Sequence, residues 1–192
     1  MIRFEGVAGG ILPESAIVTD VALGDAHGCA VVNGRLHCWG DNEFGQLGVG
    51  GTAATDRPRV LSVEGSWRGV AAGAFHSCAL DELGRVACWG RNDRGQLGIG
   101  DRDARDLPVF VALPGRATLV TTDFSHTCAL LADATLYCWG KNDEGELGQS
   151  DPFPGDQSTA ADALTPVVVP GSFRAAETGQ GHTCAIRLGA AL

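Results

Sequence analysis

The chain has 192 residues, 44% hydrophobic and 19% charged, which suits one folded domain or part of a larger one. Its 28 glycines and 8 prolines disfavour long helices. The 14 basic and 23 acidic residues give a net charge of −9, which disfavours binding to the phosphate backbone of nucleic acid. No apolar run approaches the roughly 18 residues that span a membrane, and the first residues lack the pattern of a signal peptide. We therefore expect neither membrane insertion nor an export signal within this chain.

Along the chain, residues 1–15 match the rest poorly, and we interpret them as the remnant of a preceding unit or as an N-terminal strand. A repeat follows over residues 16–188, and residues 189–192 form a truncated end. Each complete copy reads His-x-Cys-Ala, an apolar run, and then Cys-Trp-Gly-x-Asn-x-x-Gly-x-Leu-Gly, and the fourth copy contains only the first part. The copies begin near His27, His76, His126 and His182. The triplets Cys-Trp-Gly begin at residues 38, 88 and 138, 50 residues apart, so three and a half repeats are present.

The first repeat contains a β-hairpin signal. Asn33-Gly34 lies between two apolar-rich runs, and this dipeptide favours a tight turn in which both residues have positive φ. Counting outward from the turn pairs Val32 with Arg35 and places Cys29 opposite Cys38. This pair falls at a non-hydrogen-bonded position, where the Cα atoms approach to about 4.5 Å, within the range that a disulfide allows.

The second and third repeats are one residue longer between their cysteines. A three-residue loop, Glu82-Leu83-Gly84, restores the opposition of Cys78 and Cys88 if Gly84 adopts the left-handed conformation. Cys128 and Cys138 have the same spacing, although their turn contains no glycine. Cys184 of the fourth copy has no opposing cysteine in the chain, and we expect an unpaired thiol that marks a truncated hairpin or forms a covalent dimer.

Short strands in units of about 50 residues, with glycine turns and a tryptophan at a fixed place, predict an all-β fold of the β-propeller type. One blade cannot bury both faces of its sheet, so the repeated tryptophans are expected to pack between blades. We interpret the repeated residues Trp39, Trp89, Trp139, Gly40, Gly90 and Gly140 as structural. Known propellers have about 4 to 8 blades, so three and a half units form a partial ring. Further blades outside the chain or self-association would complete it.

The third connector is the unusual one. Residues 149–166 are eight residues longer than the matching connectors, and extra length in repeat proteins often forms a loop on a binding face. Phe153 lies between two prolines that restrict the chain and could present its ring to a partner. Asp151, Phe153 and Asp156 are therefore candidate partner-binding residues, and the alternative is an inert insertion.

Each candidate for chemistry has a structural alternative. His27, Cys29 and Cys38 could bind zinc, and the cysteines could also be packed free thiols, but recurrence in every unit favours structural disulfides. A Cys-His nucleophile has no third residue to orient it.

Asn42, Asn92 and Asn142 suit turns better than a ligand-binding loop. Asp101, Asp103 and Asp106 lack the order of a calcium loop. We therefore predict no catalytic residue, no metal and no cofactor.

These residues carry a family resemblance. The pattern His-x-Cys-Ala followed by Cys-Trp-Gly-x-Asn-x-x-Gly-Gln-Leu-Gly resembles the repeat of the regulator of chromosome condensation family, whose propellers usually have seven blades. The cysteine-containing version looks like the form found in many predicted secreted bacterial proteins. The resemblance therefore implies an extracellular or periplasmic protein, which agrees with disulfide formation in oxidising compartments.

Family members include guanine-nucleotide exchange factors, ultraviolet receptors, and protein-binding or enzyme-inhibiting domains, and the fold alone does not choose among them. The receptors share Gly-Trp-Arg-His-Thr, and no tryptophan stands at the corresponding places here, before His27, His76, His126 and His182. We therefore expect a non-enzymatic protein–protein interaction module with an unknown protein partner. The alternatives are an exchange factor for a small GTPase and a secreted inhibitor-like or surface-binding protein.

Overall fold

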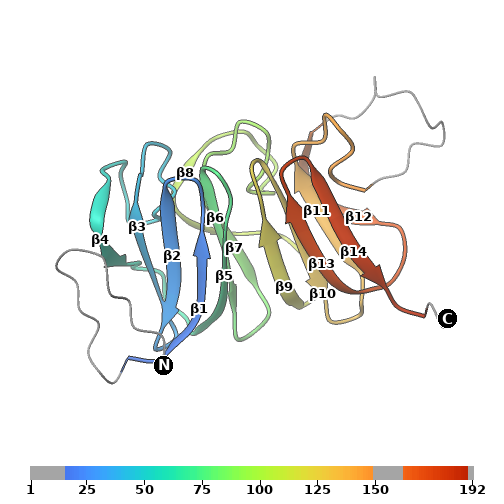
Figure 1. The fold of residues 1–192 in the computed structure, drawn as a ribbon, viewed down its shortest axis with the longest axis horizontal. Coiled ribbons are helices and arrows are strands. Elements are labelled where there is room, and N and C mark those ends of the chain that lie inside the picture. Colours follow the sequence, from blue (N-terminus) through green and yellow to red (C-terminus); the bar gives the residue numbers. More distant parts are fainter. Residues whose placement is uncertain (1–15, 149–161, 190–192) are drawn as a thin grey trace.

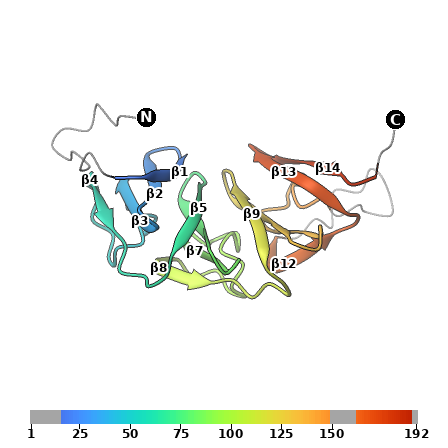
Figure 2. The ribbon, with the colours of Figure 1, turned by 90° about the horizontal axis from the view of Figure 1, so that it is seen from below.

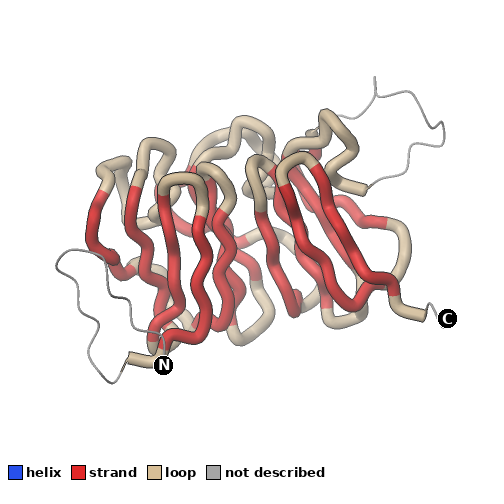
Figure 3. The backbone as a smooth tube through the Cα atoms, in the orientation of Figure 1, coloured by secondary structure: helices blue, strands red, loops and turns tan. Residues whose placement is uncertain are grey.

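The computed structural model describes residues 16–148 and 162–189, and these residues form fourteen strands and no helix (Figures 1 and 3). Three antiparallel sheets have four strands each and a fourth has two. We call them blades A, B and C and half-blade D, in chain order. Blade A contains β1 (Val18–Leu23), β2 (His27–Val32), β3 (Arg35–Gly40) and β4 (Thr55–Val60). Blade B contains β5 (Trp67–Ala72), β6 (His76–Asp81), β7 (Val86–Gly90) and β8 (Arg105–Phe110). Blade C contains β9 (Ala117–Thr122), β10 (His126–Leu131), β11 (Leu136–Gly140) and β12 (Ala163–Val169), and half-blade D contains β13 (Phe173–Gly179) and β14 (His182–Arg187).

The sheets follow one another around an arc. Figure 2 shows β1, β5, β9 and β13 along the inner side of this arc and β4, β8 and β12 along its outer side. Strands in each sheet pair in chain order, so every blade is a simple meander from the inner side outward. The arc does not close within the described residues. The predicted all-β fold, a partial propeller, is therefore confirmed.

The hairpin registers agree with the sequence prediction. β2 and β3 pair Val32 with Arg35 and Cys29 with Cys38, and the turn residues Asn33 and Gly34 have φ of 52° and 73°. In blade B, Gly84 has φ of 80°, as the three-residue loop requires. In blade C the equivalent position is Ala134, with φ of 70°. This conformation costs an L-residue about 1 kcal/mol, so the third turn carries local backbone strain.

The hydrophobic core lies between blades. One cluster joins Leu36, Leu47 and Leu61 of blade A to Trp67 and Trp89 of blade B. A second, larger cluster joins blade B to blade C and includes the fully buried ring of Trp139. A third joins blade C to half-blade D, which contributes Phe173 and Ala176 and no tryptophan to it. Each blade therefore depends on its neighbour to bury its apolar surface.

Backbone hydrogen bonds also join neighbouring blades. The first residue of each following sheet donates its N–H to a carbonyl in the hairpin turn of the blade before it. The bonds run from Trp67 to Gly34 (2.9 Å), from Ala117 to Gly84 (2.8 Å) and from Phe173 to Ala134 (2.8 Å). These contacts fix the spacing of the blades at the end where the hairpin turns lie.

Candidate functional site: the loop face

The meander places the longest connections within each blade, those of the β3–β4 type, at one end. The β1–β2 and β3–β4 connections and their equivalents lie at this end, which we call the loop face, and the β2–β3 type turns lie at the opposite end. The described part of the loop face comprises residues 24–26, 41–54, 73–75, 91–104, 123–125, 141–148, 162 and 180–181. Side chains from three blades meet there, and they include the histidines and asparagines considered above.

The repeated histidines form a buried relay between blades. His27 Nε2 lies 2.9 Å from Ser77 Oγ of the next blade, and this hydroxyl donates to the Gln46 carbonyl at 2.9 Å. Because the hydroxyl has one proton, the histidine must donate its Nε2–H to the serine oxygen. The next two interfaces repeat the arrangement, with His76 at 2.9 Å from Thr127 and His126 at 3.0 Å from Thr183.

The relay keeps the histidines neutral. The buried Nδ1 atoms of His27 and His76 have no hydrogen-bond partner, so a protonated ring would leave a buried N–H without an acceptor. Burial lowers the pKa of His27 to about 4 and that of His76 to about 3, and it also lowers the pKa of His126. A neutral, buried ring whose Nε2–H is bonded to the next blade suits a structural role better than proton transfer.

The cysteines beside these histidines are joined in pairs within their hairpins. Disulfides link Cys29 to Cys38, Cys78 to Cys88 and Cys128 to Cys138, each with a Cα–Cα distance of 4.1 Å. All six are fully buried. Their sulfurs cannot then act as thiolate ligands or nucleophiles. Cys184 is a free, exposed thiol. No group of three or more potential metal ligands occurs in the part of the chain that the structure describes.

The tryptophans of the triplets close the same interfaces. Trp89 Nε1 donates to the Gln46 carbonyl at 2.8 Å, and Trp139 Nε1 donates to the Gln96 carbonyl at 2.9 Å. Each glutamine carbonyl therefore accepts one bond from an indole and one from the relay hydroxyl. Trp39 of the first blade is partly exposed, unlike Trp89 and Trp139. Gly40, Gly90 and Gly140 have φ between 101° and 103° at the ends of β3, β7 and β11.

The repeated asparagines hold the long loops in place. Asn42 donates to the carbonyls of Gly51 and Ala53, both at 3.0 Å, and accepts the Leu47 N–H at 2.9 Å. Asn92 is bound in the same way, and its amide also reaches the Asp101 carboxylate. All three asparagines are buried. They are therefore committed to the loops and are not exposed to a ligand.

The acidic connector of blade B is likewise bound within the chain. The Asp101 carboxylate forms an ion pair with Arg105 at 2.6 Å and accepts the Asp103 N–H. These hydrogen bonds and this ion pair hold the pKa of Asp101 below its usual value, the bond from the Asp103 N–H being the largest cause. Asp106 accepts the Gly51 N–H at 2.6 Å, which ties this connector to that of blade A.

Three phenylalanines form an aromatic ladder across the loop face. Phe44 of blade A lies 5.4 Å from Phe75 of blade B, and Phe75 lies 6.4 Å from Phe124 of blade C, both edge to face. The Arg91 guanidinium lies 5.0 Å from the Phe44 ring and 5.5 Å from the Phe75 ring. Phe124 is 39% exposed, and Phe44 and Phe75 are half-buried. The ladder therefore presents apolar area from three blades to solvent.

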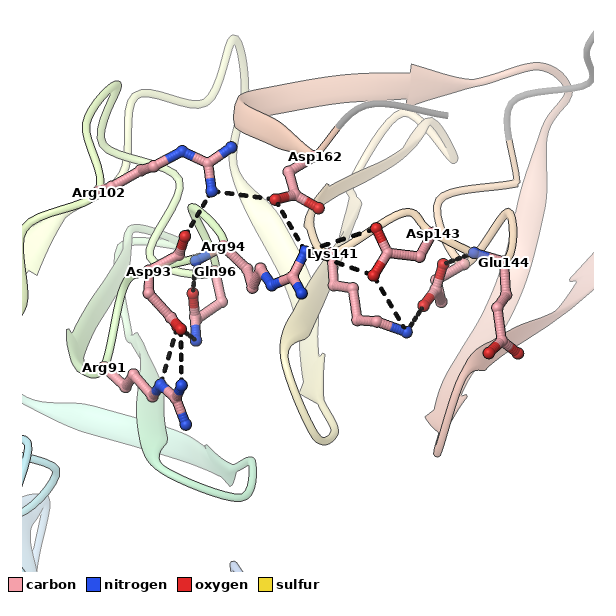
Figure 4. A network of polar contacts seen from close by, with 10 residues as sticks. Arg91, Asp93, Arg94, Gln96, Arg102, Lys141, Asp143, Glu144 and Asp162 are labelled. Atoms are coloured by element: carbon pink, nitrogen blue, oxygen red, sulfur yellow. Dashed lines mark hydrogen bonds and ion pairs between the residues drawn. The ribbon is translucent and has the colours of Figure 1, made fainter. Parts of the chain in front are cut away.

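Beside the ladder, a network of charges joins blades B and C (Figure 4). Arg91 forms a two-bond ion pair with Asp93, at 2.6 and 2.9 Å. Arg94 reaches Asp143 of the next blade at 3.3 Å, and Asp162 binds both Arg94 and Arg102. The Arg91–Asp93 and Arg94–Asp143 pairs are partly solvent-exposed and contribute little to stability, whereas the Asp162 side chain is only 6% exposed. They position a rim of mixed charge around the apolar surface.

One substitution in this network is compensated. Glu146 stands where the first two repeats have Gln46 and Gln96, and Lys141 stands where they have Asp41 and Arg91. Lys141 Nζ binds the buried Glu146 carboxylate at 2.7 Å. Burial alone would raise the pKa of Glu146, but the bond from Lys141 and the Glu144 N–H lower it overall. The chain's one lysine is thus engaged in a structural ion pair.

The candidate loop residues Asp151, Phe153 and Asp156 lie outside the described residues. The aromatic ladder, the histidine relay and Trp67 were not predicted from the sequence. The ladder escaped notice because its phenylalanines occupy three different positions of the repeat. No helix that could cross a membrane occurs in residues 16–148 and 162–189.

Comparisons with known proteins agree with this architecture. Two sequence profiles, each described as the regulator of chromosome condensation (RCC1) repeat, match the chain. One matches residues 33–80 and 84–130, and the other matches residues 18–46, 67–96 and 124–146. No curated protein matches the sequence.

Solved structures show the same fold. Yeast RCC1 (Prp20), in a complex with Kap60, aligns with a TM-score of 0.75 and 23% identity over 88% of this chain and 42% of that chain. Human WBSCR16 aligns with a TM-score of 0.76 and 22% identity over 92% of this chain and 47% of that chain. The chain thus spans less than half the length of these proteins. The repeated sequence, the four-stranded blades and the two profiles together show that this chain belongs to the regulator of chromosome condensation (RCC1) repeat family.

Proposed function

We propose that this chain is a non-enzymatic protein-interaction module whose partner docks on the aromatic ladder of the loop face. The observation that carries the proposal is the row of Phe44, Phe75 and Phe124 across three blades, with Phe124 39% exposed. Exposed aromatic and arginine side chains in a polar rim are typical of binding hot spots. The histidines, cysteines and asparagines considered as catalytic or ligand-binding residues form structural contacts: the histidines in the relay, six cysteines in disulfides and the asparagines in the loops. These contacts support a binding role for the protein.

The relatives support a protein partner in general terms. Yeast Prp20 was solved in a complex with Kap60, and another study concerns its binding to Gsp1p and histones. At 23% identity these likenesses extend to the fold alone. Three buried disulfides favour an oxidising compartment, so we place the partner outside the cytosol. A secreted inhibitor-like or surface-binding protein fits this setting better than an exchange factor for a small GTPase.

The test places a photo-crosslinking residue, p-benzoylphenylalanine, at position 124 or at position 83. Leu83 is the matched control because it is 61% exposed in the β6–β7 turn, at the end of the blade opposite the loop face. The protein is irradiated in the culture or tissue that produces it, and crosslinked proteins are identified by mass spectrometry. A partner crosslinked at position 124 and absent at position 83 is expected.

Affinity then provides the quantitative test with the purified partner. Phe124→Ala should weaken binding at least tenfold, about 1.4 kcal/mol, while Leu83→Ala leaves the Kd unchanged. Both variants should melt close to the wild type, because both side chains are exposed. Equal affinity of Phe124→Ala and wild type would overturn the proposal. Accelerated nucleotide release from a small GTPase would instead support the exchange-factor alternative.

A further inference from the structure

The loop face carries most of the negative charge of the chain. Its described residues include 11 acidic and 4 basic side chains, a net charge of −7. The remaining described residues include 8 acidic and 9 basic side chains, a net charge of +1. The face that presents the aromatic ladder is therefore strongly acidic, and the rest of the described molecule is close to neutral. Such an asymmetric distribution attracts a positively charged partner and orients it toward this face.

The basic side chains of the loop face are already paired, and many of its carboxylates are not. Each of the four basic side chains forms an ion pair with a carboxylate of the same face, and they are Arg91, Arg94, Arg102 and Lys141. Six carboxylates of the face form no ion pair within the described residues, and they are Asp25, Asp41, Glu43, Asp103, Asp123 and Glu144. Glu43 and Asp123 directly precede Phe44 and Phe124 in the chain, and Figure 4 shows the Glu144 carboxylate without a contact to the network. Carboxylates without a cation therefore flank the ladder.

Arg91 shows how a guanidinium binds to the ladder. Its central carbon lies 5.0 Å from the centre of the Phe44 ring and 5.5 Å from that of the Phe75 ring, so it contacts two neighbouring rings at once. The electron-rich π systems of the rings attract the positive charge. The Asp93 carboxylate accepts two hydrogen bonds from the same guanidinium and holds it in place. The first pair of rings is therefore occupied by a cation of the chain itself.

The second pair of rings has no such cation. Phe75 and Phe124 meet edge to face as the first pair does, and their centres are 6.4 Å apart instead of 5.4 Å. Lys141 stands at the repeat position of Arg91, but it binds to Glu146 and not to these rings. No guanidinium or ammonium group in the described part of the chain lies over the Phe124 ring. The more exposed half of the ladder therefore has a place for a cation that the chain does not fill.

We propose that the partner of the loop face is a basic protein that places an arginine beside the rings of Phe75 and Phe124. This inference rests on the proposed function, because it concerns the same ladder. The incoming guanidinium repeats the contact that Arg91 makes with the first pair of rings, and the unpaired carboxylates supply the counter-charge. Arginine is favoured over lysine because its planar group stacks on aromatic rings and is more weakly hydrated. A second copy of the chain does not fit, because it carries the same net charge of −9.

A library of random peptides displayed on phage tests this inference with the purified chain. Phage are selected on the wild type and depleted on Phe124→Ala, so that the recovered peptides are those that need the ladder. Because the Phe124 side chain is exposed, the variant should remain folded, and a thermal melt verifies this. The recovered peptides should carry a net positive charge, and arginine should be enriched about threefold or more over the starting library.

Synthetic versions of one recovered peptide then separate the charge of the arginine from its shape. Citrulline keeps the planar group and removes the charge, so it should raise the Kd by about tenfold or more. Lysine keeps the charge without the planar group and should raise the Kd by a smaller factor. Asp123→Asn and Glu43→Gln should each weaken binding of the arginine peptide at low salt. Glu82→Gln is the matched control and should leave the Kd unchanged, because this exposed carboxylate lies in the β6–β7 turn at the opposite end of the blade.

The possible failures of this inference and of the proposed function give different results. Peptides that depend on Phe124 but show no enrichment of arginine would overturn the inference and leave the ladder as a docking surface. Equal affinity of the arginine and citrulline peptides would also overturn the inference alone. Recovery of no peptide that depends on Phe124 would overturn both.

Discussion

At the scale of single residues, the blades are joined by hydrogen bonds that the repeat delivers once per interface. A histidine donates to a hydroxyl of the next blade, and the hydroxyl donates to a buried carbonyl of the first. In a buried site, loss of one member leaves the other without a partner, which costs more than the bond itself contributes. The relay therefore makes each interface sensitive to a single oxygen atom.

Thr127→Val tests this sensitivity. The substitution keeps the shape but leaves the His76 Nε2–H without its acceptor, so the free energy of unfolding should fall by about 1–3 kcal/mol. Thr122→Val is the matched control, because the Thr122 hydroxyl has no hydrogen-bond partner and its loss should cost almost nothing. Urea denaturation measures both. A similar, small effect of the two variants would show that the relay contributes little.

The same histidines predict a pH dependence. Their pKa values are lowered in the folded state, to about 4 for His27 and about 3 for His76, against 6.5 in the unfolded chain. The unfolded chain therefore binds protons first, and stability falls as the pH drops below about 6.5. At pH 5 each histidine should cost about 2 kcal/mol relative to pH 7.5.

Urea midpoints between pH 7.5 and 5 measure this loss. This pH range lies above the pH at which aspartates with lowered pKa values, such as Asp101, begin to take up protons, so the histidines dominate the change in stability. His76→Gln retains an N–H donor for Thr127 and should remove about one proton from the pH dependence. Constant stability from pH 7.5 to 5 would contradict neutral, buried histidines.

The turn of blade C provides a backbone prediction. Ala134 has φ of 70°, where glycine is free of strain, so Ala134→Gly should stabilise the chain by about 0.5–1 kcal/mol. The reverse change in blade B, Gly84→Ala, should destabilise by at least that amount. Its new Cβ would also lie 2.8 Å from the Arg116 Cβ. The melting temperatures of the two variants, compared with that of the wild type, test this prediction. A higher melting temperature for Gly84→Ala would refute backbone strain at this turn position.

At the scale of strands and hairpins, the sequence predicts local geometry well. Asn33-Gly34 defines both the turn and the register of β2 and β3, because a two-residue turn leaves one way to pair the flanking residues. The glycine of the second turn does the same for β6 and β7. These predictions need only neighbours along the chain.

Contacts between blades could not be predicted in this way. His27 and Ser77 are 50 residues apart, and nothing in their repeat positions indicates that the bond reaches forward to the next blade. Trp67 stacks on Phe110 of its own blade at 6.3 Å, yet the tryptophan has no counterpart in the other repeats. The ladder joins three phenylalanines from non-equivalent positions. A comparison of the repeats reveals residues that recur at equivalent positions. The three phenylalanines of the candidate site do not recur in this way, so the comparison does not find them.

The hairpin cysteines predict a definite thiol count. Alkylation of the unfolded, non-reduced chain should label one cysteine, Cys184, and leave the other six protected as three pairs. Peptide mapping should recover the pairs within hairpins, because each closes a loop of only 9 or 10 residues. Seven labelled thiols would remove the disulfides and, with them, the reason to place the protein outside the cytosol.

At the scale of the whole molecule, the chain is a row of blades held together by its interfaces. All three interfaces contain the relay, but only the first two bury a tryptophan between blades. Stability should therefore be highest in blade B, which has a complete interface on each side, and lowest in half-blade D. The aromatic ladder lies on this framework as the surface on which we propose that a folded partner docks.

Native-state hydrogen exchange tests this arrangement most directly. Amides of β6 and β10 should exchange most slowly, since both strands are fully buried and paired on two sides. Amides of β14 should exchange faster by a factor on the order of 100 or more, because the strand is exposed and, among the described strands, pairs only with β13. Protection of β14 equal to that of β10 in the isolated chain would contradict an open half-blade and the account built on it.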